Sequence, residues 1–295
     1  MPAKKVAPAA DADTASTKPG VQQAHVIQAA PASASSSGVR ASPYARSLAR
    51  DLGVDLEKVA PGPDGIVQPA AVVRAFGQPP APNLDAGPSY RMEPLSSMRQ
   101  AMAKNMIACL STPTFRVSAR VSIQKLRETA AAKKISLTVL IARACAITIK
   151  DIPIFNAVYT PDGLARRDRV DIAIAVDSPD GLITPVLRDV GERALAELVG
   201  DWHTLRDKVK HRRLAPQEYQ GGTFYVSNLG MFPAVHDFDA ILPLGAAAIL
   251  CVGAESDGQA SFTLSCDHRV VSGADGARFL QELGKRLSEV DALSS

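Results

Sequence analysis

Two segments poor in large apolar side chains divide this chain and limit what each part of it can fold into. Residues 1–39 are rich in Ala, Pro, Ser, Gln and Thr, and residues 78–91 contain the run QPPAPNLDAGPS. Such segments cannot bury enough apolar surface to offset the entropy lost on ordering. We therefore predict a flexible arm over 1–39, a compact island over 40–77, a linker over 78–91 and a large globular domain over 92–295.

The composition argues against several classes of protein. Hydrophobic residues make up 46% of the chain, which permits a buried core, and the formal net charge of +3 is too small to indicate a nucleic-acid partner. No run of about 18 apolar residues occurs, so we predict no membrane span. The four cysteines lack metal-binding spacing, so we expect free thiols in a reducing compartment and no metal. The N-terminus has no apolar signal region, which favours the cytoplasm, or a plastid stroma or mitochondrial matrix after removal of a presequence.

The island has the sequence of two short helices. Ser42 suits an N-cap, Pro43 the first helical position and Gly53 the C-terminal cap, and Gln68–Phe76 predicts a second helix. So small a core is marginal on its own, so we expect the island to serve as a docking surface. Arg46 and Arg50 share one helical face by their i,i+4 spacing, although a solvated face alone would also explain them.

The region after Tyr90 alternates between helical and strand-like apolar patterns, which predicts an α+β (or α/β) two-layer fold. The helix over 137–150 is apolar on nearly all sides and should be buried. The predicted helices are 96–109, 123–133, 137–150, 195–211 and 274–290, and the predicted strands are 115–121, 170–176, 183–187, 223–226, 247–252 and 261–266.

The sharpest chemical signal is the segment SCDHRVVSGADG, residues 265–276. An apolar strand leads directly into Asp267, His268 and Arg269, before a Ser-Gly turn. A histidine at a strand end can project into a cleft, and its ordinary pKa of about 6.5 suits proton transfer at neutral pH. The alternative is a histidine that is only hydrogen-bonded to nearby backbone.

This segment resembles the active-site signature of dihydrolipoamide acyltransferases, whose fold is that of chloramphenicol acetyltransferase. The resemblance extends in order over 92–290 and is closest to plastid and cyanobacterial pyruvate dehydrogenase acyltransferases. The island is similar to the family's peripheral-subunit-binding domain, a small helical domain that precedes the catalytic one. The segments that carry the resemblance are 41–46, 53–56, 98–103, 153–157, 181–186, 222–232, 239–243 and 267–274.

The resemblance implies transfer of an acyl group, acetyl being favoured, between dihydrolipoamide and coenzyme A. His268 would be the general base and Ser227 the hydroxyl donor to the oxyanion. Thr184, Pro185 and Arg99 occupy positions that bind coenzyme A or line its channel. Without the resemblance, Ser227 is a turn hydroxyl, and Thr184 and Pro185 are ordinary strand residues.

The resemblance also implies partners. The family's active site forms between the subunits of a homotrimer, which can belong to a larger core. The island would bind dihydrolipoamide dehydrogenase, a 2-oxoacid decarboxylase or both, with Arg46 and Arg50 at the contact. Its loop reads APGPDGI over 60–66 and lacks the basic residue that the family usually has there.

Two departures from the family pattern stand out. Ser272 occupies the position, four residues after His268, where an aspartate is usual, and either Asp267 or Asp275 could substitute electrostatically. In addition, no lipoyl domain precedes the island. The lipoyl group would then come from another domain or subunit, unless the chain is a truncated product.

Two other functions remain open from the sequence. One is a catalytically silent core or docking subunit that recruits dihydrolipoamide dehydrogenase, which the absent lipoyl domain and Ser272 favour. The other is a free-standing acetyltransferase for a small alcohol or amine, which the island makes less favourable.

Overall fold

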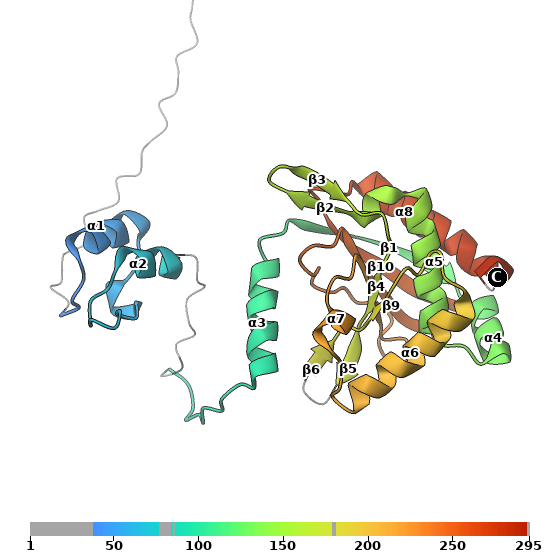
Figure 1. The fold of residues 1–295 in the computed structure, drawn as a ribbon, viewed down its shortest axis with the longest axis horizontal. Helices are drawn as coiled ribbons and strands as arrows, with labels where there is room; N and C mark the ends of the chain where they lie inside the picture. The colour runs from blue at the N-terminus through green and yellow to red at the C-terminus, as the bar shows by residue number, and fades with distance from the viewer. Residues whose placement is uncertain (1–37, 77–83, 85, 179–180, 294–295) are drawn as a thin grey trace, which may run out of the picture. The chain divides into compact units, whose positions relative to one another are not determined.

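A computed structural model of the protein describes residues 38–76, 84, 86–178 and 181–293. The predicted flexible arm lies almost wholly outside the described residues, as does part of the predicted linker. The chain divides into two compact units, Met1–Arg91 and Met92–Ser295, each with its own apolar core (Figure 1).

The small unit contains the two predicted helices, α1 (Pro43–Leu52) and α2 (Pro69–Phe76), with a 3-10 turn η1 (Leu56–Lys58) between them. Ser42 caps α1 by accepting a hydrogen bond from the Ala45 amide, and Gly53 ends the helix at a φ of 66°, as the sequence predicts. The core is small and aliphatic. Its buried residues are Ala45, Ala49, Val59, Val67 and Val72.

A six-stranded mixed sheet organises the large unit, in the order β1-β10-β9-β8-β4-β7. The antiparallel strands β1, β10 and β9 are the longest, whereas β8 pairs in parallel with both β9 and β4. The strands of this sheet are β1 (Thr114–Ser122), β4 (Ile172–Ile174), β7 (Val186–Leu187), β8 (Phe224–Asn228), β9 (Ala248–Ser256) and β10 (Gln259–Asp267).

Helices cover one face of this sheet (Figure 1). The apolar helix α5 is the most deeply buried, as predicted, and packs beside α8. The helices are α3 (Ser97–Cys109), α4 (Gln124–Lys133), α5 (Leu137–Asp151), α6 (Leu195–Lys210), α7 (Pro216–Tyr219) and α8 (Gly273–Ser288), with 3-10 turns η2 (Pro153–Asn156) and η3 (Val290–Leu293). The predicted α+β class is confirmed.

The loop 229–247 lies against the side chains of the other face. Leu242 and Phe238 of this loop pack on Ile249 and Cys251 of β9. Gly253 allows the loop to approach closely, because a Cβ there would lie 2.0 Å from the carbonyl oxygen of His236. The sheet is therefore buried between helices on one side and an irregular loop on the other.

Two of the predicted strands are each split. The predicted strand 170–176 becomes β4 and β5 (Val176–Ser178), and the predicted strand 183–187 becomes β6 (Gly181–Ile183) and β7. Pro185 marks the second break, because it has no amide to donate to a ladder. β5 and β6 form their own two-stranded sheet, apart from the main one.

A hairpin of β2 (Ala157–Thr160) and β3 (Gly163–Arg166) was not predicted from the sequence. The four residues of β3 are all exposed, so they carry no apolar alternation that would indicate a strand. The turn residues Pro161, Asp162 and Gly163 were the available signal.

Candidate active site

His268 directly follows β10, and backbone pairing fixes the position of its main chain. The His268 amide donates to the carbonyl oxygen of Pro113 at 2.9 Å, and the next residue back, Asp267, pairs with Thr114 of β1. The side chain is exposed. The imidazole is in tilted contact with the ring of Phe115, with 4.5 Å between the ring centroids and 46° between the planes.

The residues on either side of His268 form a closed polar network. Asp267 is only 2% exposed, and its carboxylate accepts three bonds from Arg269, from the amide at 3.0 Å, Nε at 2.9 Å and Nη2 at 2.8 Å. The Arg269 guanidinium rests on the ring of Tyr159 in β2, 4.4 Å from its centroid, and Nη2 reaches the hydroxyl of Thr112 at 3.5 Å. The turn that carries His268 is thus held from both sides.

Ser227 lies in β8, with its main chain in the sheet. It pairs in parallel with Cys251, and it shares the side of the strand that Tyr225 faces, toward the loop 229–247. The next residue, Asn228, points to the other side and donates to the hydroxyl of Thr138 at 3.1 Å. Ser227 is half-buried in a single chain.

Thr184 and Pro185 lie close to Ser227. The Pro185 carbonyl accepts a bond from Ile174 at 2.9 Å, and Ile174 pairs with Val226, the neighbour of Ser227. The structure therefore gathers these three predicted site residues at one end of the sheet.

Arg99, on α3, is exposed. It lies one helical turn from Met102, whose terminal atoms lie 3.9 Å from the position that a Cβ on Gly181 of β6 would take. The face of α3 that carries Arg99 is therefore turned toward β6, which ends next to Thr184.

The structure does not bring His268 and Ser227 together within one chain. Ser227 pairs with Cys251, which pairs with Thr263, and His268 lies five residues beyond Thr263 along β10. At about 3.3 Å per residue and 4.8 Å per strand, their Cα atoms are about 20 Å apart. We call the two regions the histidine end and the serine end.

Ser272, where the family's aspartate is usual, forms the N-cap of α8. Its hydroxyl accepts from the Asp275 amide at 3.2 Å and donates to the Asp275 carboxylate at 2.6 Å, and that carboxylate accepts the Ser272 amide at 3.0 Å. These bonds form a capping box, and the Ser272 hydroxyl and amide hold the pKa of Asp275 below its ordinary value. The hydrogen bonds of Ser272 are therefore local to the start of α8.

A buried carboxylate, Asp171, lies just before β4, beside Thr223 at the start of β8. Asp171 is 3% exposed and accepts two bonds from Arg169 and one from Arg188, each at 2.8 Å, and one from the Asp189 amide at 2.9 Å. Burial pushes the pKa of Asp171 up, but the hydrogen bonds from Arg169, Asp189 and Arg188 outweigh it and hold the pKa below 3.8. This network joins β4 to the segment after β7.

The two predicted partner-binding arginines differ in their surroundings. The Arg46 guanidinium donates to the carbonyl oxygens of Val39 at 2.8 Å and Ala41 at 3.3 Å, so it holds the start of the small unit in place. The Arg50 side chain is exposed, one turn further along α1. Arg50 is therefore the freer of the two guanidinium groups.

The remaining reactive groups are not candidate nucleophiles. All four cysteines are buried free thiols, and desolvation raises the pKa of Cys251 and of Cys266 to about 12. Within the described residues, His, Cys, Asp and Glu nowhere form a group of three that could hold a metal ion. In the same part of the chain, the helices are too short or too polar to cross a membrane.

Comparison with protein families gives two matches in the order that the sequence predicts. Residues 87–294 match the 2-oxoacid dehydrogenases acyltransferase (catalytic domain), and residues 39–70 match the E3 binding domain. The chain is 37% identical to dihydrolipoyllysine-residue acetyltransferase component 4 of the chloroplastic pyruvate dehydrogenase complex of Arabidopsis thaliana, over 90% of this chain and 64% of that protein. It is 33% identical to the mitochondrial acetyltransferase component of Caenorhabditis elegans, over 91% of this chain and 59% of that protein.

Solved structures agree with these matches. The dihydrolipoamide acetyltransferase of Azotobacter vinelandii has a TM-score of 0.69 and 30% identity, over 73% of this chain and 99% of that one. That structure addresses the role of a serine, a histidine and, four residues after the histidine, an asparagine in catalysis. The cubic core of a pyruvate dehydrogenase multienzyme complex has a TM-score of 0.67, 30% identity and the same two coverages.

A small helical domain followed by an acyltransferase-type catalytic domain defines the class, and the two family matches confirm this predicted order. The chain belongs to the 2-oxoacid dehydrogenase acyltransferase family. It spans about three fifths of the length of the curated relatives described above.

Proposed function

We propose that this protein transfers an acetyl group between dihydrolipoamide and coenzyme A as the core subunit of a pyruvate dehydrogenase complex. The observation that carries the proposal is the placement of His268, an exposed imidazole on a turn held by a backbone hydrogen bond to Pro113 and by the bonds between Asp267 and Arg269. The membership of the chain in the acyltransferase family, and the acetyltransferase names of the chain's relatives, support the same reaction.

The chemistry requires a base and a hydrogen-bond donor. The neutral imidazole of His268 removes the proton from the thiol of coenzyme A, whose ordinary pKa near 8.5 leaves little thiolate at neutral pH. The thiolate attacks the carbonyl carbon of acetyl-dihydrolipoamide, and the hydroxyl of Ser227 donates to the oxyanion that forms. Collapse of this tetrahedral intermediate breaks the carbon–sulfur bond to dihydrolipoamide, and the departing sulfur takes the proton back from His268.

The active site in this proposal forms between two copies of the chain. His268 and Ser227 are about 20 Å apart in one chain, too far for both to contact one carbonyl group. A second copy would place the serine end of one chain, with Thr184, Pro185 and Arg99 beside the coenzyme A path, against the histidine end of the next. A homotrimer meets this requirement three times by rotation.

The small unit supplies the contact with a second enzyme in this proposal. Its match to the E3 binding domain favours dihydrolipoamide dehydrogenase as the partner, and Arg50 is the exposed basic group that an acidic surface would meet. The lipoyl group would reach the core from another domain or subunit. The four buried free thiols suit a reducing compartment, either a bacterial cytoplasm or an organelle interior such as the stroma or matrix.

The first experiment measures acetyl transfer from acetyl-coenzyme A to free dihydrolipoamide by the purified protein and by His268→Ala. We expect turnover by the wild type and a loss of at least about 100-fold in the variant, since general-base catalysis contributes roughly 10²–10⁴-fold. Absence of turnover in a folded wild-type oligomer would reject the enzyme and leave a recruiting subunit.

Co-expression of two inactive variants tests the shared site. His268→Ala and Ser227→Ala are inactive or nearly so alone, but a random hybrid contains interfaces that carry an intact histidine and an intact serine. About one interface in four has that pairing, so we expect about a quarter of wild-type activity. No recovery in a verified hybrid oligomer would show that both residues serve the same chain.

Partner binding is tested by titration of dihydrolipoamide dehydrogenase in a calorimeter. Arg50→Glu should weaken binding about tenfold or more by placing a like charge at the contact. Arg74→Glu makes the same change in charge on the exposed side of α2 and serves as the matched control. Equal effects of the two variants would indicate a general charge effect and no contact at α1.

A further inference from the structure

The histidine end contains an aromatic side chain for which the proposed reaction has no direct use. Phe115, near the start of β1, is half-buried and packs against the main core, and its ring lies 4.5 Å from the imidazole of His268. A ring in this position contacts the group that would move the proton, although it can neither donate nor accept that proton.

The register of the sheet places the two rings together. Phe115 pairs with Cys266, so His268, two residues further along the chain, is its diagonal neighbour on the same side. The 46° angle between the planes is a tilted arrangement, of the kind that aromatic pairs adopt. The hydrogen bond from the His268 amide to the carbonyl oxygen of Pro113 continues the pairing of the two backbones beyond Phe115 and Cys266.

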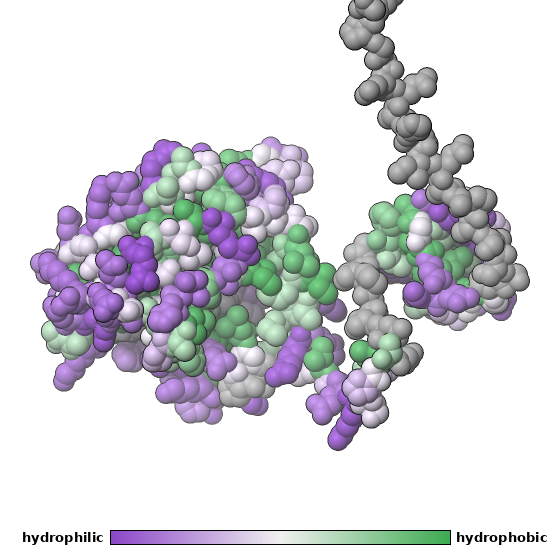
Figure 2. All heavy atoms as spheres, turned by 180° about the vertical axis from the view of Figure 1, so that it is seen from behind, coloured by the Kyte–Doolittle hydropathy of each residue, from purple (hydrophilic) through white to green (hydrophobic). Residues whose placement is uncertain are grey.

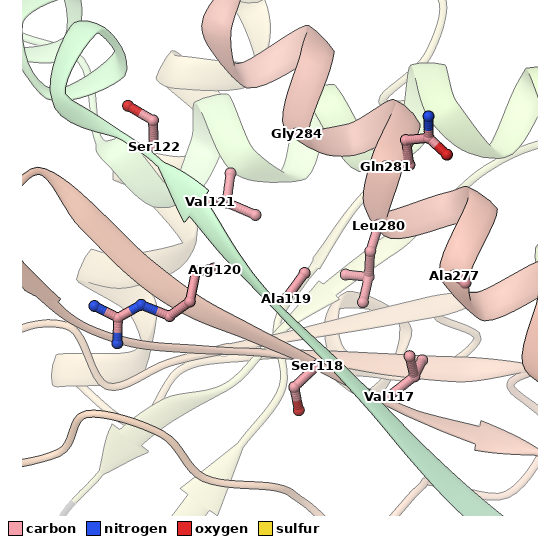
Figure 3. A pocket seen from close by; sticks show the side chains of 10 residues that line it. All are labelled: Val117, Ser118, Ala119, Arg120, Val121, Ser122, Ala277, Leu280, Gln281 and Gly284. Carbon is pink, nitrogen blue, oxygen red and sulfur yellow. The ribbon is translucent and has the colours of Figure 1, made fainter.

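The Phe115 ring also lies close to α8, at a glycine. A Cβ on Gly276 would lie 3.7 and 3.8 Å from two ring atoms of Phe115, and 2.8 Å from Cγ1 of Val117, which is closer than packed atoms allow. Figure 3 shows α8 running beside β1, with Val117 and Ala119 directed toward the helix and Ser118 away from it. The missing side chain of Gly276 therefore allows α8 to lie directly over β1.

We propose that Phe115 is a positioning residue for His268, and that Gly276 is required because its lack of a side chain lets α8 hold that ring in place. The Phe115 ring fixes the imidazole plane and covers one of its faces. The other face and the ring nitrogens remain open to the substrate thiol. Without the aromatic ring the imidazole would sample several rotamers, only a fraction of which point a nitrogen at the thiol.

The decisive variant is Phe115→Leu, which keeps an apolar side chain but removes the ring. Phe238→Leu is the matched control, because Phe238 is also half-buried but packs in the loop cluster on the other face of the sheet. Circular dichroism and the oligomeric state establish that both variants are folded and assembled.

The first measurement is independent of enzyme activity. Diethyl pyrocarbonate modifies exposed imidazoles, and peptide mass spectrometry gives the rate for each histidine. We expect Phe115→Leu to raise the modification rate of His268 severalfold, and Phe238→Leu to leave it unchanged. The exposed histidines His203, His211 and His236 serve as internal references in each sample.

The second measurement uses the acetyl-transfer reaction, and only this part rests on the proposed function. Phe115→Leu should lower kcat about tenfold with little change in the KM for coenzyme A, since it disorders the base and leaves substrate contacts intact. Gly276→Ala should lower kcat in the wild-type background, through the displaced ring, but not in the Phe115→Leu background. Its cost in thermal stability, from the contact with Val117, should persist in both backgrounds.

The outcomes separate the two proposals. An unchanged His268 modification rate in folded Phe115→Leu overturns the positioning role, whatever the activity of the wild type. An inactive wild type, with a His268 modification rate that still responds to Phe115→Leu, rejects the acetyl-transfer function and keeps the positioning role. A lower kcat accompanied by an equally large rise in KM would instead assign Phe115 to substrate binding, and this result would also overturn the positioning role.

Discussion

The histidine end and the serine end of the catalytic unit are built in different ways. At the histidine end, a buried carboxylate, a guanidinium and two aromatic rings hold one turn of chain outside the sheet. At the serine end, strand pairing of β8 fixes the main chain of Ser227, whereas the buried carboxylate Asp171 precedes β4 and lies beside Thr223, four residues from Ser227.

The catalytic unit also exposes an apolar surface. Hydrophobic side chains are exposed along α3, and Figure 2 shows a green patch at this edge of the catalytic unit. Only one residue of α3, Cys109, is buried in a single chain. The difference teaches that the turn carrying His268 is fixed within one chain, whereas the apolar face of α3 is left for another molecule to cover.

The largest effect is expected at the histidine end, from Asp267→Ala. The change leaves the Arg269 guanidinium without its partner, so we expect a loss of about 3 kcal/mol in unfolding free energy together with at least a tenfold lower kcat. Denaturant unfolding and the acetyl-transfer assay measure the two effects. Glu282→Ala, which breaks an exposed pair with Lys285, should change neither by much. Full activity in Asp267→Ala would show that the turn needs no carboxylate.

Ser227→Ala should affect activity alone. A hydroxyl aimed at an oxyanion contributes about 3 kcal/mol to the barrier, so kcat should fall roughly 100-fold, whereas the melting temperature stays within a degree or two because no hydrogen bond of the chain is lost. Steady-state kinetics and calorimetry test this contrast with Asp267→Ala. A large drop in melting temperature would make Ser227 a structural residue.

The hydrogen-bond network of Asp171, between the start of β4 and the segment after β7, should be sensitive to acid. The pKa of Asp171 is lower in the folded chain than its ordinary value of 3.8. The ionised carboxylate therefore stabilises the fold fully above the ordinary pKa, and this stabilisation is lost as the pH falls through the folded-state pKa. We expect Asp171→Asn to lower the unfolding free energy by about 2 kcal/mol at neutral pH and to flatten the fall of melting temperature below pH 4. Asp177→Asn, at an exposed position of β5, is the control. If the melting temperature of Asp171→Asn fell below pH 4 as steeply as that of the wild type, the Asp171 carboxyl would be excluded as the cause of the fall.

The smallest effect is expected from Ser272→Ala. Loss of the N-cap should cost about 1 kcal/mol of unfolding free energy, with kcat nearly unchanged, because the hydroxyl bonds only to Asp275. Ser272→Thr keeps the cap and should behave as the wild type. A tenfold fall in kcat without a change in stability would instead place this hydroxyl in the reaction, as a substitute for the aspartate of the family.

Most of the fold, but only part of the candidate site, could be predicted from the sequence. Helix caps such as Ser42 and Gly53 and the apolar helix α5 are local signals, and they were read correctly. Strand ends were less readable, since β4 and β5 form one apolar run, and only pairing with different partners separates them.

The contacts of His268 could not be predicted either, because they also depend on how the strands pair. The motif singled out His268, but Phe115 and Tyr159 lie more than a hundred residues before it and became visible as neighbours only through the sheet register. Gly276 was part of the recognised segment, yet its role depends on which ring lies beneath the helix.

The position of β1 at the end of the main sheet affects how the chain behaves before it meets a partner. An unpaired strand edge of nine residues is a template for aggregation. Two such edges meeting antiparallel about Ser118 would set Arg116 of one chain opposite Arg120 of the other, and like charges in that position repel. Such repulsion disfavours edge-to-edge pairing of chains in which the ion pair of Arg116 with Asp239 has not yet formed.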